Sequence, residues 1–219
     1  MSQADLPGSG RGPILLVFPF QGELEAFLQG EPAERTDTLI KGYRVHSLAS
    51  QPSWRMAVCG QGKVEGALAC QCLSDVLNPA AVLLLGSATA LAPDLQVGCL
   101  VLADPGIEWD FGSGKPPSFR AVPDFPALAR VAGGAILSGD RDVCDPSEKA
   151  GLHAQFAAEA LAWEGAGFHR FLRHSGKPGW EIRVITETAQ EGRMNIAQLK
   201  ELMAADFPAL RAVIVAAFA

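Results

Sequence analysis

The chain alternates short, continuous apolar runs with segments whose apolar residues recur at helical spacing. Residues 14–18 (ILLVF) and 81–85 are such runs, which are typical of strands buried on both faces. Further strands are predicted at residues 43–48, 54–59, 97–103, 135–137 and 180–185. Helices are predicted at residues 23–28, 64–77, 146–156, 164–173, 194–204 and 208–218. Residues 157–163 fit either state.

The order of these elements predicts an α/β fold. A strand at 54–59, a glycine turn, a helix at 64–77 and a strand at 81–85 form a βαβ unit, which implies parallel pairing. The strands at 43–48 and 54–59 suit a hairpin, and Gly86-Ser87 is expected to end the strand at 81–85. Residues 104–126 hold five prolines and predict a long loop. We expect one domain over residues 14–219 after a disordered tail at residues 1–13.

Composition restricts the possible partners of the chain. Apolar residues make up 48% and charged residues 19%, which predicts a packed core. The net charge is −6, and an acidic surface repels phosphate backbones, so we expect no nucleic-acid binding. We expect no membrane association, because no apolar run approaches the ~20 residues that span a bilayer. The five cysteines include no CxxC pair and suit reduced residues of a cytoplasmic protein.

Polar residues follow several of the predicted strands. Glu23, Ser87, Asp140, Glu164 and Glu187 all stand just after a predicted or ambiguous strand. Parallel strands bring their carboxyl ends to one edge of a sheet, where ligands bind in α/β proteins. We therefore expect these side chains to gather there, although each carboxylate taken alone is equally consistent with a solvated surface charge.

The turn Gly60-Gln61-Gly62-Lys63 opens the helix at 64–77 and allows two interpretations. Its backbone N–H groups could bind an anion, or the glycines could serve a tight strand-to-helix turn. The turn lacks the spacing of a Walker A loop and the third glycine of GxGxxG, and the chain contains no GxSxG nucleophile elbow.

Three segments resemble those of one family. Residues 60–64 (GQGKV) look like its GxGKV turn, residues 85–93 and 97–101 like its G[ST]AGGL…VGD segment, and residues 138–140 like its SGD turn. The chain is similar, from about residue 14 to the C-terminal helix, to the methylthioadenosine/S-adenosylhomocysteine nucleosidases and their phosphorylase and futalosine-hydrolase relatives. The resemblance implies a three-layer α/β/α fold around a mixed, partly barrel-like sheet, and a homodimer.

The resemblance also implies roles for individual residues. Glu23 falls where the family keeps a carboxylate that activates the attacking water, and Glu187 where an Asp protonates the purine N7. The expected substrate-binding residues are Ser87 beside the ribose, Val143 at the base through its backbone, Trp163 against the nucleoside, Glu164 at the ribose hydroxyls, and Arg183 in the segment usually read R-x-I-S-D. Such a reaction needs a proton donor at the base and a carboxylate near the sugar, but no metal or cofactor.

The sequence departs from the family pattern at named positions. Glu187 replaces the Asp, Thr89 and Ala90 replace paired glycines, and Ala162 replaces the first Glu of an EMEA stretch. Leu84 stands where the hexameric phosphorylases place a phosphate-binding Arg, which favours water over phosphate as the nucleophile. The expected activity is hydrolysis of the N-glycosidic bond of a purine-type nucleoside. A phosphorylase and a non-catalytic nucleoside binder are the alternatives.

Overall fold

Ten strands and five helices alternate in the part of the chain that the computed structural model describes, namely residues 12–31, 35–112, 115–119, 131–192 and 195–218. The strands are β1 (Ile14–Phe18), β2 (Arg35–Ile40), β3 (Tyr43–Leu48), β4 (Trp54–Val58), β5 (Ala81–Ala90), β6 (Leu100–Glu108), β7 (Ser118–Phe119), β8 (Ala132–Ser138), β9 (Ala158–Ala162) and β10 (Gly179–Glu187). The helices are α1 (Gln21–Phe27), α2 (Lys63–Leu77), α3 (Pro146–Phe156), α4 (Gly165–Ser175) and α5 (Ile196–Phe218).

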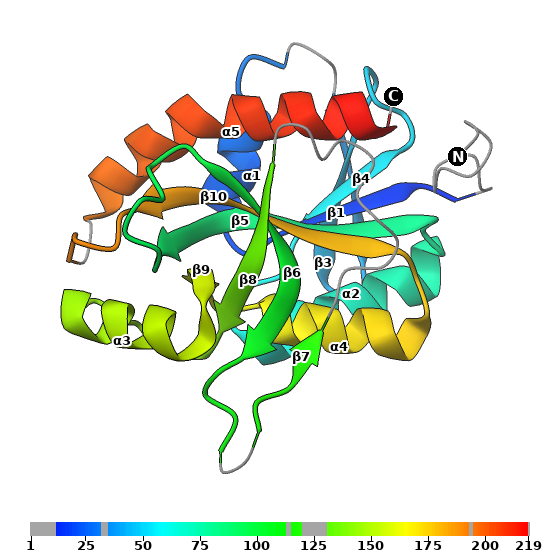
Figure 1. The fold of residues 1–219 in the computed structure, drawn as a ribbon. Coiled ribbons are helices and arrows are strands. Elements are labelled where there is room, and N and C mark those ends of the chain that lie inside the picture. Colours follow the sequence, from blue (N-terminus) through cyan, green and yellow to red (C-terminus); the bar gives the residue numbers. More distant parts are fainter. Residues whose placement is uncertain (1–11, 32–34, 113–114, 120–130, 193–194, 219) are drawn as a thin grey trace.

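Strand β1 lies in the middle of three layers, and its apolar run explains why it can do so. Successive side chains of a strand point to opposite faces. Ile14, Leu16 and Phe18 pack into a core cluster with α1 and α5, whereas Leu15 and Val17 pack with α2 and α4. Figure 1 shows these two helix pairs on opposite sides of the sheet. The predicted three-layer α/β/α arrangement is confirmed.

The sheet is mixed and closes partly on itself. Its order is β10-β6-β8-β9-β5-β1-β4-β3-β2, and β10 also pairs with β5, so that five strands form a closed barrel. All five barrel strands contribute to one core cluster, which includes Ala88, Ala103 and Ala160. Small side chains suit the narrow interior of so small a barrel. The barrel-like sheet expected from the family resemblance is therefore present.

The predicted βαβ unit is correct in direction but wrong in pairing. Strands β4 and β5 are both parallel to β1, which lies between them. The hairpin of β3 and β4 is confirmed as an antiparallel pair. The predicted stop at Gly86-Ser87 is also wrong, because β5 continues to Ala90. Its extension pairs with β10 on one side, where Arg183 lies opposite Gly86, and with β9 on the other.

Other boundaries differ from the prediction for reasons of tertiary structure. Strand β6 begins later than expected and runs into the predicted loop, where it pairs with β8. The ambiguous segment forms β9. The two predicted C-terminal helices are one helix with Pro208 inside it. Proline removes one helical hydrogen bond, but Phe207 and Leu210 keep the helix on the same buried face as Met203.

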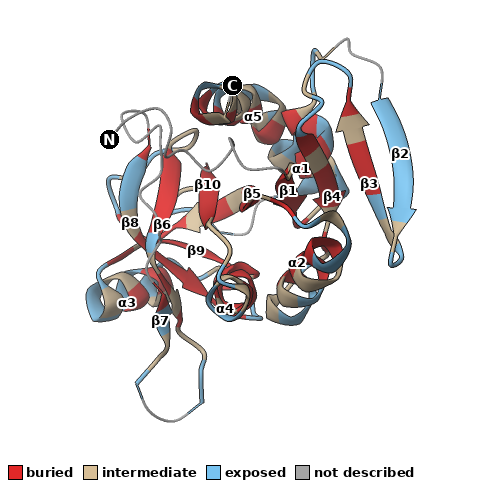
Figure 2. Ribbon diagram, turned by 90° about the vertical axis from the view of Figure 1, so that its right-hand side faces the viewer, coloured by how far each residue is buried: buried red, intermediate tan, exposed pale blue. Residues whose placement is uncertain are grey.

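Strand β2 was not predicted, because its sequence (RTDTLI) lacks an apolar alternation. It pairs only with β3 among the described strands, and Figure 2 shows it as an exposed edge of the sheet. Most of the predicted disordered tail and parts of the predicted loop at 104–126 fall outside the described residues.

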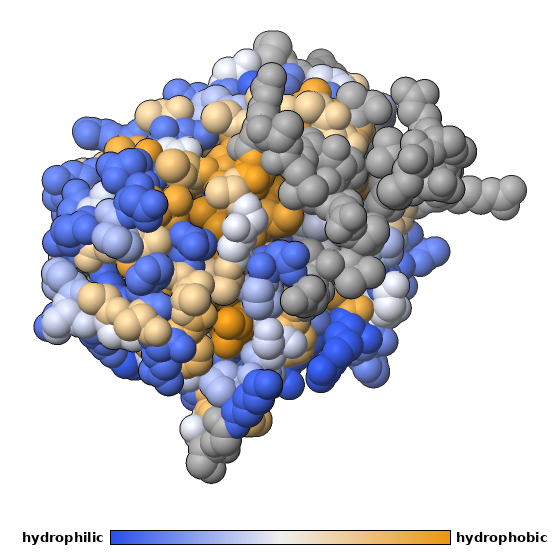
Figure 3. Space-filling model, viewed as in Figure 1, coloured by the Kyte–Doolittle hydropathy of each residue, from blue (hydrophilic) through white to orange (hydrophobic). Residues whose placement is uncertain are grey.

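An apolar hollow lies between the barrel and α5, lined by Leu95, Leu100, Ala132, Ala209 and Val213 among others. Figure 3 shows apolar surface gathered between α5 and the barrel strands. Within the described ranges, no helix combines the length and the hydropathy that crossing a bilayer requires.

Helices α2 and α4 cross closely enough that a side chain at Gly167 has no room. An added Cβ there would lie 1.8 Å from the carbonyl oxygen of Lys63. We expect Gly167→Ala to lower the free energy of unfolding by about 3 kcal/mol or more, because backbone cannot yield cheaply to overpacking. Gly151→Ala in α3 is the matched control, since nothing lies within 4 Å of its Cβ. In that control the free energy of unfolding should rise by about 0.5–1 kcal/mol, because alanine has a higher helix propensity than glycine. Urea denaturation of both variants provides the measurement, and equal stabilities would contradict the close crossing.

Candidate active site

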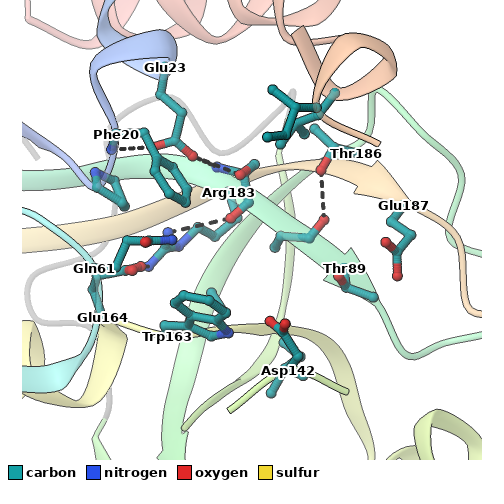
Figure 4. A pocket seen from close by; sticks show the side chains of 17 residues that line it. Phe20, Glu23, Gln61, Thr89, Asp142, Trp163, Glu164, Arg183, Thr186 and Glu187 are labelled. Carbon is teal, nitrogen blue, oxygen red and sulfur yellow. Dashed lines mark hydrogen bonds and ion pairs between the residues drawn. The ribbon is translucent and has the colours of Figure 1, made fainter. Parts of the chain in front are cut away.

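A cavity of about 330 Å³ opens where the barrel meets α1, α4 and α5. Figure 4 shows Glu23 and Glu187 well apart in it, with Trp163 and Asp142 on a further wall. The lining residues are Pro19, Phe20, Glu23, Gln61, Ser87, Ala88, Thr89, Asp142, Leu161, Ala162, Trp163, Glu164, Arg183, Thr186, Glu187, Ile196 and Leu199. The cavity thus combines apolar walls with several carboxyl groups.

Glu23 is a fully buried carboxyl in the first turn of α1. One oxygen accepts hydrogen bonds from the backbone N–H of Ser87 (2.6 Å) and from its hydroxyl (2.7 Å). The other accepts from the N–H of Phe20 (3.0 Å), which caps the start of the helix. Burial raises the pKa of Glu23 from 4.5 to about 7, although the hydrogen bonds from Ser87 oppose the shift. The group can therefore gain or lose a proton near neutral pH.

Arg183 compensates the charge of the neighbouring glutamates. Its Nε donates to Glu181 (2.8 Å), one terminal nitrogen donates to Glu164 (3.1 Å), and the other donates to the carbonyl of Ser87 (3.4 Å). All three charged side chains are buried. Burial opposes ionisation of Glu181, but the attraction of Arg183 and a hydrogen bond with His169 prevail and lower its pKa to about 2. The neighbouring carboxylates raise the pKa of Arg183 despite its burial.

The glycine turn before α2 does bind anions, but they belong to the protein. The N–H of Gly62 donates to Glu164 (3.2 Å), and the N–H of Lys63 donates to Asp140 (2.9 Å). Gly60 and Gly62 have φ values of +93° and +92°, which side chains rarely adopt. The turn is therefore tight, and its N–H groups hold two carboxylates of the protein itself, one at the start of α4 and one after β8.

Glu187 reaches the cavity beside a β-bulge. The pairing of β10 with β5 shifts register between Ile185 and Glu187, so Thr186 and Glu187 both line the cavity although they are consecutive. An ion pair with Lys149 of α3 holds the Glu187 carboxylate. The side chain of Lys149 is fully buried, and its ammonium also donates to the carbonyls of Thr188 (3.2 Å) and Glu191 (2.6 Å).

The structure brings six of the seven predicted site residues together. Glu23, Ser87, Trp163, Glu164, Arg183 and Glu187 line the cavity. Val143 does not line it, and its side chain packs against Leu137 and Leu161 in a separate cluster. Its neighbour Asp142 lines the cavity instead. The backbone contact predicted for Val143 stays a prediction.

Sequence reasoning missed two buried charges that shape the site. Glu181 was identifiable, because it stands two residues before Arg183 on a strand and therefore on the same face. Lys149 carries no such signal, since nothing in its local sequence distinguishes it from a solvated helix residue. Only the tertiary contacts of α3 reveal its burial.

A closed five-strand barrel with helices on both sides, and a cavity of buried carboxyls at its edge, defines a phosphorylase-like α/β protein. A family model described as the phosphorylase superfamily matches residues 13–218. The chain therefore belongs to the phosphorylase superfamily.

Individual relatives are more distant. The chain is 25% identical over 195 residues to an aminodeoxyfutalosine nucleosidase of Campylobacter jejuni, covering 80% of this chain and 82% of the relative. It is 29% identical over 168 residues to a 5′-methylthioadenosine/S-adenosylhomocysteine nucleosidase of Geobacillus thermodenitrificans. That match covers 66% of this chain and 71% of the relative. A Helicobacter pylori nucleosidase of the latter kind, solved with butyl-thio-DADMe-Immucillin-A, has a TM-score of 0.80 at 20% identity over 94% of this chain and 97% of its own. Futalosine hydrolase of the same species has a TM-score of 0.79 at 19% identity, over 93% of this chain and 96% of the hydrolase. These structures share the fold.

The raised pKa of Glu23 makes stability depend on pH. Between pH 4.5 and about 7 the folded chain retains a proton that the unfolded chain has released, so stability falls as the pH rises. The wild-type chain should lose on the order of 3 kcal/mol from this group over that range. Glu23→Gln cannot ionise and should lack this loss. We therefore expect its stability relative to wild type to improve from pH 5 to pH 8.

Chemical denaturation at a series of pH values measures this difference. Glu25→Gln is the control, because Glu25 lies on the same helix but is exposed. A stability difference between Glu23→Gln and wild type that stays constant with pH would show that the buried carboxyl titrates normally.

Proposed function

We propose that this chain is a nucleosidase that hydrolyses the N-glycosidic bond of a purine-type nucleoside to free base and sugar. The observation that carries the proposal is the pair of carboxyls in one cavity with different surroundings. Glu23 is buried with a pKa near 7, whereas Glu187 is held by an ammonium group. Two carboxyls in unlike environments can take different roles in proton transfer. The nucleosidase names of the relatives support the same class of reaction.

The proposed reaction assigns one role to each end of the cavity. Glu23 as carboxylate takes a proton from water, whose oxygen bonds to the anomeric carbon of the sugar. The bond from that carbon to the base nitrogen breaks, and its electron pair leaves with the base. Glu187 in its protonated form delivers a proton to the base, which departs neutral. The negative charge of Glu164 stabilises the cationic sugar in the transition state.

The surrounding residues bind and orient the nucleoside. Glu164 uses one oxygen for Gly62 and the other for Arg183. Each carboxylate oxygen has a second lone pair, which can accept a ribose hydroxyl. Ser87 borders the ribose beside Glu23, and the apolar face of Trp163 packs against the nucleoside. Val143 contacts the base through its backbone in this proposal.

Water suits this cavity better than phosphate does. Among the described residues that line it, Arg183 is the cationic side chain, and Glu181 and Glu164 already compensate its charge. A phosphate dianion would therefore meet carboxylates without a matching cation. Leu84 occupies the place of the phosphate-binding Arg of the hexameric phosphorylases.

Base release from methylthioadenosine, adenosylhomocysteine, futalosine, adenosine and inosine, followed by liquid chromatography, tests this proposal. We expect release without phosphate from at least one nucleoside. Glu23→Gln and Glu187→Gln should each reduce kcat about 100-fold or more, because each removes a proton-transfer group. The exposed Glu25→Gln should retain wild-type activity. Release that requires phosphate would indicate a phosphorylase, and a thermal shift with nucleoside but no release would indicate a binder.

We further propose that the protein is a cytoplasmic homodimer. All five cysteines are free, which suits a reducing compartment. Val64 and Leu68 of α2 are 73% and 49% exposed and line a surface hollow together with Phe171 of α4. The family resemblance implies a homodimer, and a second copy of the chain would cover this apolar surface.

Light scattering coupled to size exclusion tests the dimer. Leu68→Glu places a charge in the hollow and should convert the dimer to a monomer. Val76→Glu is the matched control, because Val76 is also exposed on α2 but does not line the hollow. A wild-type chain that elutes as a monomer would exclude the homodimer.

A further inference from the structure

Lys149 is a buried charge that the reaction outlined above does not use. It lies on α3, outside the cavity, and its side chain has no exposed surface. Burying an ammonium group costs free energy unless it is paired and hydrogen-bonded. Lys149 meets this requirement fully, because its three N–H donors reach Glu187 and the carbonyls of Thr188 and Glu191.

These three acceptors belong to the end of β10 and the turn that follows it. That turn leads to α5, whose residues Ile196 and Leu199 line the cavity. The ammonium thus fixes both the carboxylate of Glu187 and the backbone beside it. It also draws the longer Glu side chain toward α3, in a position where the family resemblance implies an Asp.

We propose that Lys149 is a positioning residue that holds the Glu187 carboxylate in place when no base is present. This inference rests on the proposed function, in which Glu187 donates a proton to the leaving base. A neighbouring positive charge favours the carboxylate form. Once Glu187 has given its proton to the base, its carboxylate can return to the ion pair with Lys149. The ammonium itself transfers no proton.

Other charged groups around Glu187 are held by partners of their own or lie across the cavity. The carboxylate of Glu191 accepts from the N–H and hydroxyl of Thr188. Glu164 and Arg183 pair with each other. The remaining charged groups that line the cavity are Glu23 and Asp142. Lys149 is thus the cation in direct contact with Glu187 among the described residues.

The ratio of kcat/KM for Lys149→Met to that of wild type, measured from pH 5 to pH 8, tests the proposal. Loss of the ammonium lets Glu187 keep its proton to higher pH, whereas the protonation of Glu23 is common to both proteins. The ratio should therefore rise with pH, by about tenfold or more. At pH 5 it should be about 0.1 to 0.01, because Glu187 is misplaced. A ratio that is constant with pH would mean that Lys149 has a structural role only, and it would overturn the proposal.

Three further variants separate charge from packing. Lys149→Gln keeps two N–H donors for the carbonyls of Thr188 and Glu191 but loses the charge, and its ratio should also rise with pH. Lys149→Arg keeps the charge, and its ratio should stay flat. Lys177→Met is the matched control, because Lys177 donates to Asn78 and to the carbonyl of Pro79 at the surface, away from the cavity. Its ratio should be one at every pH, and a pH-dependent ratio in this control would overturn the assignment.

Carbon-13 NMR of the glutamate carboxyls tests the pair independently of any activity. The Glu187 resonance is assigned by its loss in Glu187→Gln. Removing the neighbouring positive charge should move its titration to higher pH in Lys149→Met and in Lys149→Gln than in wild type. An unchanged midpoint in both variants would overturn the role of Lys149. If wild-type protein released no base from any nucleoside, the proposed function would fail while this titration still decided the role of Lys149.

Discussion

The guanidinium of Arg183 is the interaction on which the site depends. Glu181, Glu164 and Glu23 are all buried near it, and each would repel the others without a shared cation. Removing one partner from a buried ion pair typically costs about 3–5 kcal/mol, because the other charge is left uncompensated. The planar fork of an arginine presents its donors in fixed directions, so Arg183 can hold Glu181, Glu164 and the carbonyl of Ser87 at once. Strands β10 and β5 and the residue that caps α4 therefore meet through one side chain, and Glu164 extends the network to the turn before α2.

Much of the fold could be predicted because, in many elements, the local residue pattern favours the same secondary structure that the folded chain adopts. The predicted bounds of β1 and of α3 agree with the structure to the residue. The prediction failed where long-range pairing decides the outcome. Residues 86–90 form strand only because β10 and β9 lie on either side of them, and the polar β2 forms only because β3 offers it an edge.

The candidate site was predictable to the extent that it follows strand ends and a family pattern. Glu23, Glu164 and Glu187 lie in one cavity. Parallel strand ends explain Glu23, which follows β1, and Glu187, which ends β10, whereas Glu164 follows β9, which is antiparallel to β5. The sequence could not reveal which charges are buried, since burial is a property of the assembled layers. Lys149 and His169 look like ordinary helix residues in the sequence, yet both are buried against glutamates of β10.

The close crossing of α2 and α4 links the packing of these helices to the position of a carboxylate in the cavity. Gly167 lies against the backbone of Lys63, and one residue earlier Gly62 binds Glu164, which begins α4. A displacement of either helix therefore moves a carboxylate of the cavity. The evolutionary freedom of the site is consequently limited by two glycines, Gly62 and Gly167, that do not line the cavity.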